Sequence, residues 1–99
     1  MTEGAKLAVH IHDKCDVDYE VVNVRKSAGE QVEWHSDGDA FTIEFDSSPF
    51  EQTKFEVPAG GCISSGSIRK DAPYARYHYT IRSRVNLAMS ADPDVDVRH

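Results

Sequence analysis

Hydrophobic and polar residues alternate along most of this chain, and this alternation predicts strands rather than helices. In the segment 6–13, Leu7, Val9 and Ile11 fall on one face, and polar or small residues fall on the other. No window of about a dozen residues keeps apolar positions at helical spacing with helix-forming residues between them. The pattern therefore favours a protein built of β-strands.

Further segments of the same kind follow, separated by residues that favour turns. The clearest is 41–45, where two Phe residues and one Ile share a face and polar residues share the other. The remaining strands that we predict span 19–24, 31–35, 55–57, 77–81 and 94–97. Turn signals rich in Asp, Gly and Pro lie at 37–38 and 58–61. About seven short strands with such turns predict an all-β sandwich or barrel.

The remaining segments do not divide the chain into more than one domain. Residues 62–66 are compatible with a short strand or a loop, and a single helical turn fits 47–53 or 68–74. A length of 99 residues is that of one domain, 1–99, with 1–5 and 98–99 expected to be flexible ends. We find no internal repeat, linker or low-complexity tract.

Charge and composition exclude some classes of protein. The net charge is −6 and the Lys and Arg residues are scattered, whereas binding to nucleic acid needs clustered positive charge. No apolar run is long enough to span a membrane. The first residues lack the basic and apolar regions of a signal peptide. We therefore expect a cytoplasmic protein, or a periplasmic or secreted one if a signal peptide has been removed.

The order of these features resembles the cupredoxins, the family of plastocyanin and azurin-like copper proteins. The resemblance covers most of 17–97. The matching stretches are 22–24, 28–34 with its Gly-acidic turn and Trp, 41–45, 55–60 with Phe-x-Val and a Pro/Gly turn, 65–66, 77–81 with Tyr-x-Tyr, and 92–97. The resemblance implies a Greek-key β-sandwich of about seven strands.

The same resemblance places the copper ligands of the family on residues of this chain. Cupredoxins hold copper with a His at the head of the His-x-hydrophobic-x-Phe strand, a Cys at the end of the tyrosine strand, a second His and usually a Met. These positions fall on Phe41, Ile81, Arg84 and Met89. Phe and Ile have no donor atom, Arg has no acceptor lone pair, and a single thioether binds copper too weakly. The resemblance therefore implies a cupredoxin-like domain without type 1 copper, and no cofactor.

His10, His12 and Cys15 are the best remaining candidates for a metal site. Residues two apart on a strand share a face, so both imidazoles have access to one ion, and zinc or copper suits imidazole and thiolate ligands. A structural zinc site, however, normally has four ligands. We therefore favour a simpler interpretation, in which the two histidines lie on the solvent face of an edge strand.

Two further groups of residues are candidates for chemistry. His35, Asp37 and Asp39 surround an Asp-Gly turn, but the ligand spacing of a calcium loop is missing, so we interpret them as turn residues. Cys62 beside two glycines suggests a small thiol-dependent enzyme or redox protein, although a lone cysteine more often acts as a small buried hydrophobe. No Gly-x-Ser-x-Gly sequence is present, and we expect a protein that is not an enzyme.

The predicted function is a binding or accessory role. We expect the domain to contact another protein through its loops or an exposed strand edge, with no nucleic acid and no membrane as partner. Strand alternation assigns most aromatic residues to the core, with Phe50 and Tyr74 expected to be exposed. The segment 68–76 mixes Arg and Tyr, which are enriched in interfaces but also occur in ordinary surface loops. Both cysteines are expected to be free thiols, as in a reducing cytoplasm, and their spacing is not that of a CxxC site.

Overall fold

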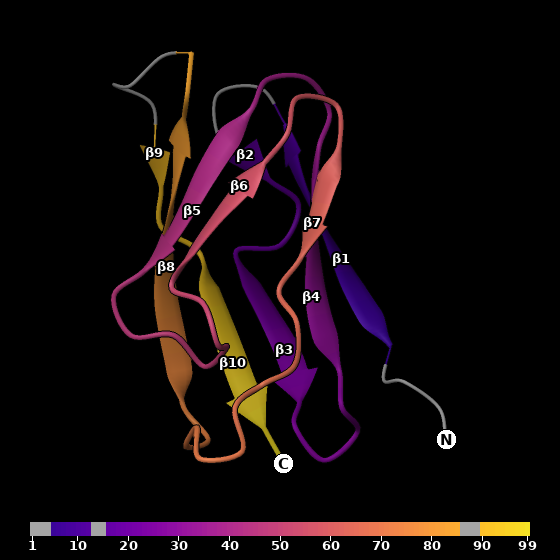
Figure 1. Ribbon diagram of the computed structural model, residues 1–99, viewed down its shortest axis with the longest axis vertical. Helices are drawn as coiled ribbons and strands as arrows, with labels where there is room; N and C mark the ends of the chain where they lie inside the picture. Colours follow the sequence, from indigo (N-terminus) through magenta and orange to yellow (C-terminus); the bar gives the residue numbers. More distant parts are fainter. Residues whose placement is uncertain (1–4, 13–15, 86–89) are drawn as a thin grey trace.

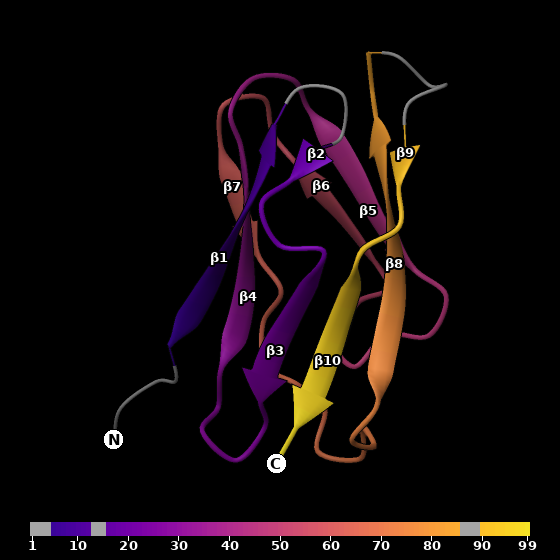
Figure 2. The same ribbon diagram turned by 180° about the vertical axis from the view of Figure 1, so that it is seen from behind.

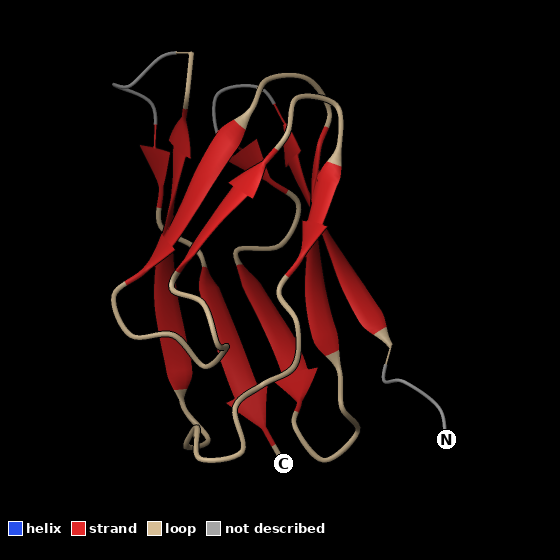
Figure 3. Ribbon diagram, viewed as in Figure 1, coloured by secondary structure: helices blue, strands red, loops and turns tan. Residues whose placement is uncertain are grey.

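The computed structural model describes residues 5–12, 16–85 and 90–99, and within these ranges it contains strands and no helix (Figure 3). The prediction of an all-β fold is therefore confirmed. The two segments that fitted a helical turn form irregular loops instead, and they are joined by an isolated antiparallel bridge between Phe50 and Ile68. No helix in the described ranges has the length and hydropathy to cross a membrane.

Four strands form the first sheet, in the order β2-β1-β4-β7. They are β1 (Lys6–His12), β2 (Asp16–Val17), β4 (Gln31–Ser36) and β7 (Cys62–Ser64). β1 runs parallel to β4, and the other pairs are antiparallel. In β4, Val32 and Trp34 are fully buried, whereas Gln31, Glu33 and His35 are only partly covered. This sheet therefore has one apolar inner face and one polar outer face.

The second sheet follows the order β3-β10-β8-β5-β6, with β9 paired to β8. Its strands are β3 (Val21–Arg25), β5 (Phe41–Phe45), β6 (Lys54–Val57), β8 (Arg76–Ser83), β9 (Ser90–Ala91) and β10 (Asp94–Arg98). β3 and β10 run parallel, and β10, β8, β5 and β6 pair antiparallel. In Figures 1 and 2, β8 of this sheet lies at one side of the molecule, and β1 and β4 of the first sheet lie at the other. The molecule is a two-layer β-sandwich.

The seven strands of four or more residues in the described ranges correspond to the seven that alternation predicts. Their bounds agree within two residues. The largest differences are at the end of β8, which is Ser83 rather than residue 81, and at the start of β3, which is Val21 rather than residue 19. Tyr19 precedes that strand and its side chain is exposed. The two-residue strands β2 and β9 were not predicted, because two residues are too few to show alternation.

An aromatic cluster fills the centre of the sandwich. Trp34 on β4 is fully buried, and it is surrounded by Phe45, Phe50, Phe55 and Tyr79, with ring centroids 5.1–6.3 Å from its own. Tilted and edge-on rings at these distances are the arrangements that aromatic pairs prefer. The indole Nε1 donates a hydrogen bond of 3.2 Å to the hydroxyl oxygen of Tyr79. The side chains of both sheets thus meet around one tryptophan.

The expectation that Phe50 is exposed is wrong, because its side chain is only 1% exposed. The loop after β5 folds back: Ser48 Oγ accepts the backbone N–H of Phe50 at 3.0 Å, and the bridge to Ile68 anchors the segment. The Phe50 ring then packs edge-on against Trp34. The expectation for Tyr74 is confirmed, since its side chain is exposed.

Candidate functional site

Three of the positions matched to copper ligands lie in the described part of the chain, and two of them are in the core. Phe41 on β5 is 1% exposed and Ile81 on β8 is fully buried. The register pairs Phe41 with Ser83, so Ile81 is its diagonal neighbour on the same inner face. Arg84 follows β8, is exposed, and forms an ion pair with Glu56. Met89 lies outside the described residues.

These side chains do not fit a type 1 copper ion. Phenyl and sec-butyl groups offer no donor atom, and the guanidinium of Arg84 already bonds to a carboxylate at the surface. What Phe41 and Ile81 contribute is hydrocarbon, and burying such a side chain stabilises a fold by about 1.5–3 kcal/mol. Phe41 at the start of β5 and Ile81 near the end of β8 therefore belong to the core and not to a metal centre.

The outer face of the first sheet carries a row of side chains capable of chemistry. Strand alternation turns Val9 and Ile11 inward, and therefore turns His10 outward. The register places His35 of β4 opposite His10 on one side and opposite Cys62 of β7 on the other. Glu33 precedes His35 by two residues and shares its face. We refer to His10, Glu33, His35 and Cys62 as the outer cluster.

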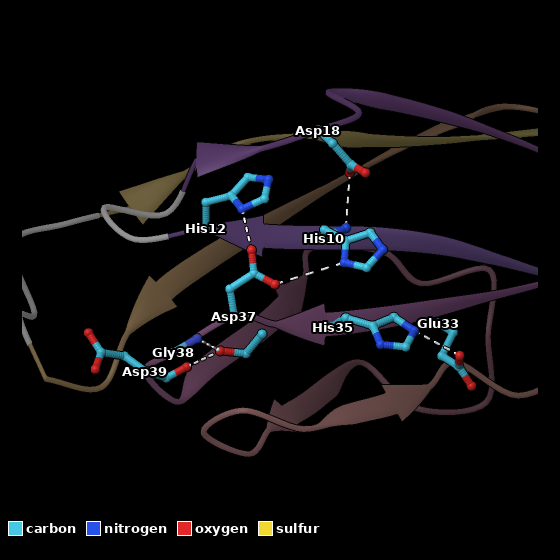
Figure 4. Close-up of polar contacts among 9 residues, drawn as sticks. His10, His12, Asp18, Glu33, His35, Asp37, Gly38 and Asp39 are labelled. Atoms are coloured by element: carbon cyan, nitrogen blue, oxygen red, sulfur yellow. Dashed lines mark hydrogen bonds and ion pairs between the residues drawn. The ribbon is translucent and has the colours of Figure 1, made fainter.

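Contacts within the outer cluster are close. His35 Nε2 lies 2.8 Å from Glu33 Oε1, and these side chains are 30% and 26% exposed (Figure 4). The ring of His10 stacks on that of His35, with centroids 5.0 Å apart and planes inclined by 24°. One ligand atom from each of Glu33, His35 and Cys62 lies within 4.8 Å of the other two. Among the described residues this is the only group of three such side chains that meets the geometry of a metal site.

Of the sequence-based candidates His10, His12 and Cys15, only the two histidines lie in the described ranges. His10 and His12 do share the outer face of β1, but both imidazoles point toward the carboxylate of Asp37 (Figure 4). His12 Nδ1 bonds to Asp37 Oδ2, and His10 Nδ1 lies 4.0 Å from Asp37 Oδ1. Cys15 lies outside the described residues. The two side chains are partly exposed, 45% and 48%, as a solvent-facing interpretation requires. The expectation of an edge strand is wrong at this end of β1, because β2 pairs with Ile11 and His12 on one side and β4 pairs with β1 on the other.

The segment around Asp37, Gly38 and Asp39 has the contacts of an ordinary turn. Ser36 Oγ donates to the carbonyl oxygen of Asp39 and accepts the N–H of Gly38 at 3.2 Å. Figure 4 shows the Asp39 carboxylate pointing away from that of Asp37. The two carboxylates do not converge as calcium ligands would.

Cys62 is exposed at the start of β7, so the expectation that it acts as a small buried hydrophobe is wrong. No hydrogen bond joins its thiol to His35 within the described ranges, whereas a thiol activated by a histidine needs such a contact. Sequence reasoning considered His35 only as a turn residue and did not consider Glu33. Alternation along 31–36 does place both on the outer face, but the register that brings Cys62 beside them is visible only in the folded chain.

A groove of about 280 Å³ opens between the edges of the two sheets. It is lined by Leu7, Ala8, Tyr19, Val21, Val22 and Asn23, from β1, β3 and the loop that precedes β3. The Tyr19 side chain beside it is 56% exposed. This is an apolar surface that solvent reaches.

Comparison with known proteins identifies the fold. No protein-family model and no curated protein sequence matches this chain. Among solved structures, it is similar to a mutant of amicyanin, a cupredoxin, in its reduced Cu(I) form at pH 4, with a TM-score of 0.60 and 16% sequence identity. The similarity covers 99% of this chain and 86% of the amicyanin chain. The chain therefore has a cupredoxin-like fold in which buried hydrocarbon occupies the positions matched to the first histidine and the cysteine of a type 1 copper site.

Proposed function

We propose that this chain is a copper-free binding module that takes an extended peptide segment of another protein at the open edge between β1 and β3. The observation that carries the proposal is the apolar groove at this edge, with the exposed Tyr19 beside it. Extended peptides commonly bind by adding a strand to an exposed sheet edge, where backbone hydrogen bonds give affinity and side-chain pockets give specificity.

The β1 edge offers unpaired backbone groups. The carbonyl oxygens of Ala5 and Ile11 accept hydrogen bonds from Gln31 and Asp37 at the two ends of β4, so the odd-numbered residues of β1 face β4. The backbone groups of Ala8 and His10 therefore face the opposite side. Those of His10 bond to Asp18, but no described strand pairs with 6–9 on that side. An unpaired stretch of this kind is a site where a partner strand can add to the sheet.

The β3 edge borders the other side of the groove. The carbonyl of Glu20 and the N–H of Lys26 bond to the two ends of β10, so the even-numbered residues of β3 face β10. The backbone groups of Val21 and Asn23 consequently point toward the groove. The groove thus has an apolar floor between two lines of backbone donors and acceptors.

Charge at the groove indicates the chemistry of the partner segment. Asp16, Asp18 and Glu20 are all exposed at one end of the groove, in a stretch that has no Lys or Arg between 16 and 20. Opposite charge across an interface raises the rate of association and rejects acidic partners. We therefore expect a segment in which apolar residues alternate with Lys or Arg.

Titration with synthetic peptides tests this function. An apolar and Lys-alternating peptide is titrated into isotope-labelled protein, with an apolar and Glu-alternating peptide as its control. We expect the Lys peptide to shift the amide resonances of Ala8, Val21 and Asn23, and the Glu peptide to leave them unchanged. Shifts confined to other parts of the molecule, or none with either peptide, would show that this edge is not the binding site.

Two tyrosines provide a matched pair of variants. Tyr19 and Tyr74 are each 56% exposed, but only Tyr19 lines the groove. Removal of an aromatic anchor from an interface typically costs about 2 kcal/mol or more, which is a loss of about 30-fold in affinity. We expect this loss for Tyr19→Ala, and an unchanged affinity for Tyr74→Ala. Equal affinities of the two variants would contradict the proposal.

A further inference from the structure

We propose that Glu33, His35 and Cys62 form a binding site for a divalent transition metal ion, with zinc as the preferred ion. The site lies on the outer face of the first sheet, on β4 and β7, and it is independent of the peptide groove at the β1 and β3 edges. It is also distinct from Phe41 and Ile81, the two positions matched to copper ligands that lie in the core on β5 and β8.

The backbone register brings the three side chains together. His35 and Cys62 are directly opposite residues of an antiparallel pair, and side chains at such positions have Cβ atoms about 4.5–5.5 Å apart. Glu33 lies two residues before His35, on the same face of β4. The arrangement therefore depends on paired strands of the sandwich and not on the conformation of a loop.

The distances between the ligand atoms are close to those that zinc requires. A tetrahedral zinc ion with bonds of about 2.0–2.3 Å places its ligand atoms about 3.3–3.6 Å apart. The ligand atoms of the three side chains already lie within 4.8 Å of one another, and Glu33 and His35 are in contact at 2.8 Å. Side-chain rotation closes the difference, because Cys62 is exposed and the other two side chains are partly exposed.

The chemistry of the three donors selects the ion. A thiolate, an imidazole and a carboxylate together suit zinc, whereas calcium and magnesium prefer oxygen ligands alone. His10 stacks on His35 and restricts the orientation of that ring. Three protein ligands leave the fourth position of a tetrahedral ion for a water molecule.

Titration with cobalt(II) provides a direct test, because cobalt replaces zinc in such sites and absorbs light when a thiolate binds it. The reduced protein is titrated with cobalt(II), and zinc(II) is then added as competitor. We expect binding of one equivalent, an absorption from the cobalt–thiolate bond, and loss of that absorption on addition of zinc.

Variants identify the ligands. Cys62→Ser is expected to abolish the thiolate absorption, and His35→Ala to weaken cobalt binding by at least about tenfold, since loss of even an outer partner of a ligand costs that much. His12→Ala and Cys15→Ser are the matched controls and are expected to bind like the unmodified protein. No cobalt binding at millimolar concentration, or thiolate absorption that persists in Cys62→Ser and disappears in Cys15→Ser, would overturn the proposal.

Discussion

The hydroxyl group of Tyr79 lies inside the aromatic core, where it accepts a hydrogen bond from Trp34. Burial raises the pKa of Tyr79 above its ordinary value of 10.0, because the phenolate form loses its hydration in the core. Burial also raises the pKa of Tyr77, an effect that the nearby Arg69 partly opposes. Deprotonation of either tyrosine is therefore less favourable in the folded state than in the unfolded chain.

A loss of stability at alkaline pH follows from these shifts. A pKa that is higher in the folded state gives a stability that is complete below pH about 10, and lost as the pH rises toward the folded-state value. Tyr79→Phe is expected to lower the free energy of unfolding by about 1–2 kcal/mol at neutral pH, since Trp34 loses its acceptor. Urea unfolding at several pH values measures this effect. Above pH 10, the free energy of unfolding of Tyr79→Phe should fall less steeply with pH than that of the unmodified protein. Parallel declines would contradict this assignment.

Single residues were the least predictable level of the structure. Period-two alternation assigned Trp34 and Phe41 to the core, and both are buried. It failed for Phe50 and Cys62, which lie outside the clearest strands. Burial of such a residue depends on whether a loop folds back over it or whether another strand covers its side chain. Neither of these tertiary contacts can be read from the neighbouring sequence.

At the scale of strands, the turn between β6 and β7 determines where the outer cluster forms. The turn is closed by a hydrogen bond of 3.0 Å from the N–H of Gly61 to the carbonyl of Pro58. Gly60 within it has a φ of 65°, in the left-handed region that residues with a Cβ rarely adopt. It connects the second sheet to the first and sets the position of Cys62 opposite His35.

Substitution of Gly60 tests the importance of this turn. A Cβ at Gly60 would meet no atom within 4 Å, so the cost of Gly60→Ala is conformational, about 1–2 kcal/mol. Gly60→Asn is expected to cost less, because Asn tolerates the left-handed region better. Urea unfolding of the two variants measures the difference. Two variants as stable as the unmodified protein would show that the turn does not constrain the fold.

The sequence predicted strands well and their pairing poorly. Alternation locates a strand because the apolar residues of the strand mark the face that is buried. The parallel pairing of β1 with β4, which aligns His10 with His35, joins residues 25 positions apart in the chain. The positions matched to copper ligands were accessible from the sequence because the resemblance locates them relative to strands with a distinct order of residues. The outer cluster could not be predicted from the sequence, because it depends on the register between paired strands.

On the scale of the whole molecule, buried apolar side chains occupy two positions of the cupredoxin-like sandwich that are matched to copper ligands. Phe41 and Ile81 lie on the neighbouring strands β5 and β8, and both face the interior. We infer that these side chains stabilise the fold by packing, without a metal ion between them. What distinguishes the molecule is therefore its surface: an open edge between β1 and β3, and the outer cluster of the first sheet.

The free energy of unfolding of Ile81→Ala, measured with urea in the absence of metal ions, tests this claim most directly. Truncation of a fully buried isoleucine removes apolar contacts and leaves a cavity. We predict a loss of about 2–5 kcal/mol relative to the unmodified protein under the same conditions. A loss below about 1 kcal/mol would contradict the account, because it is smaller than truncation of a packed core residue produces.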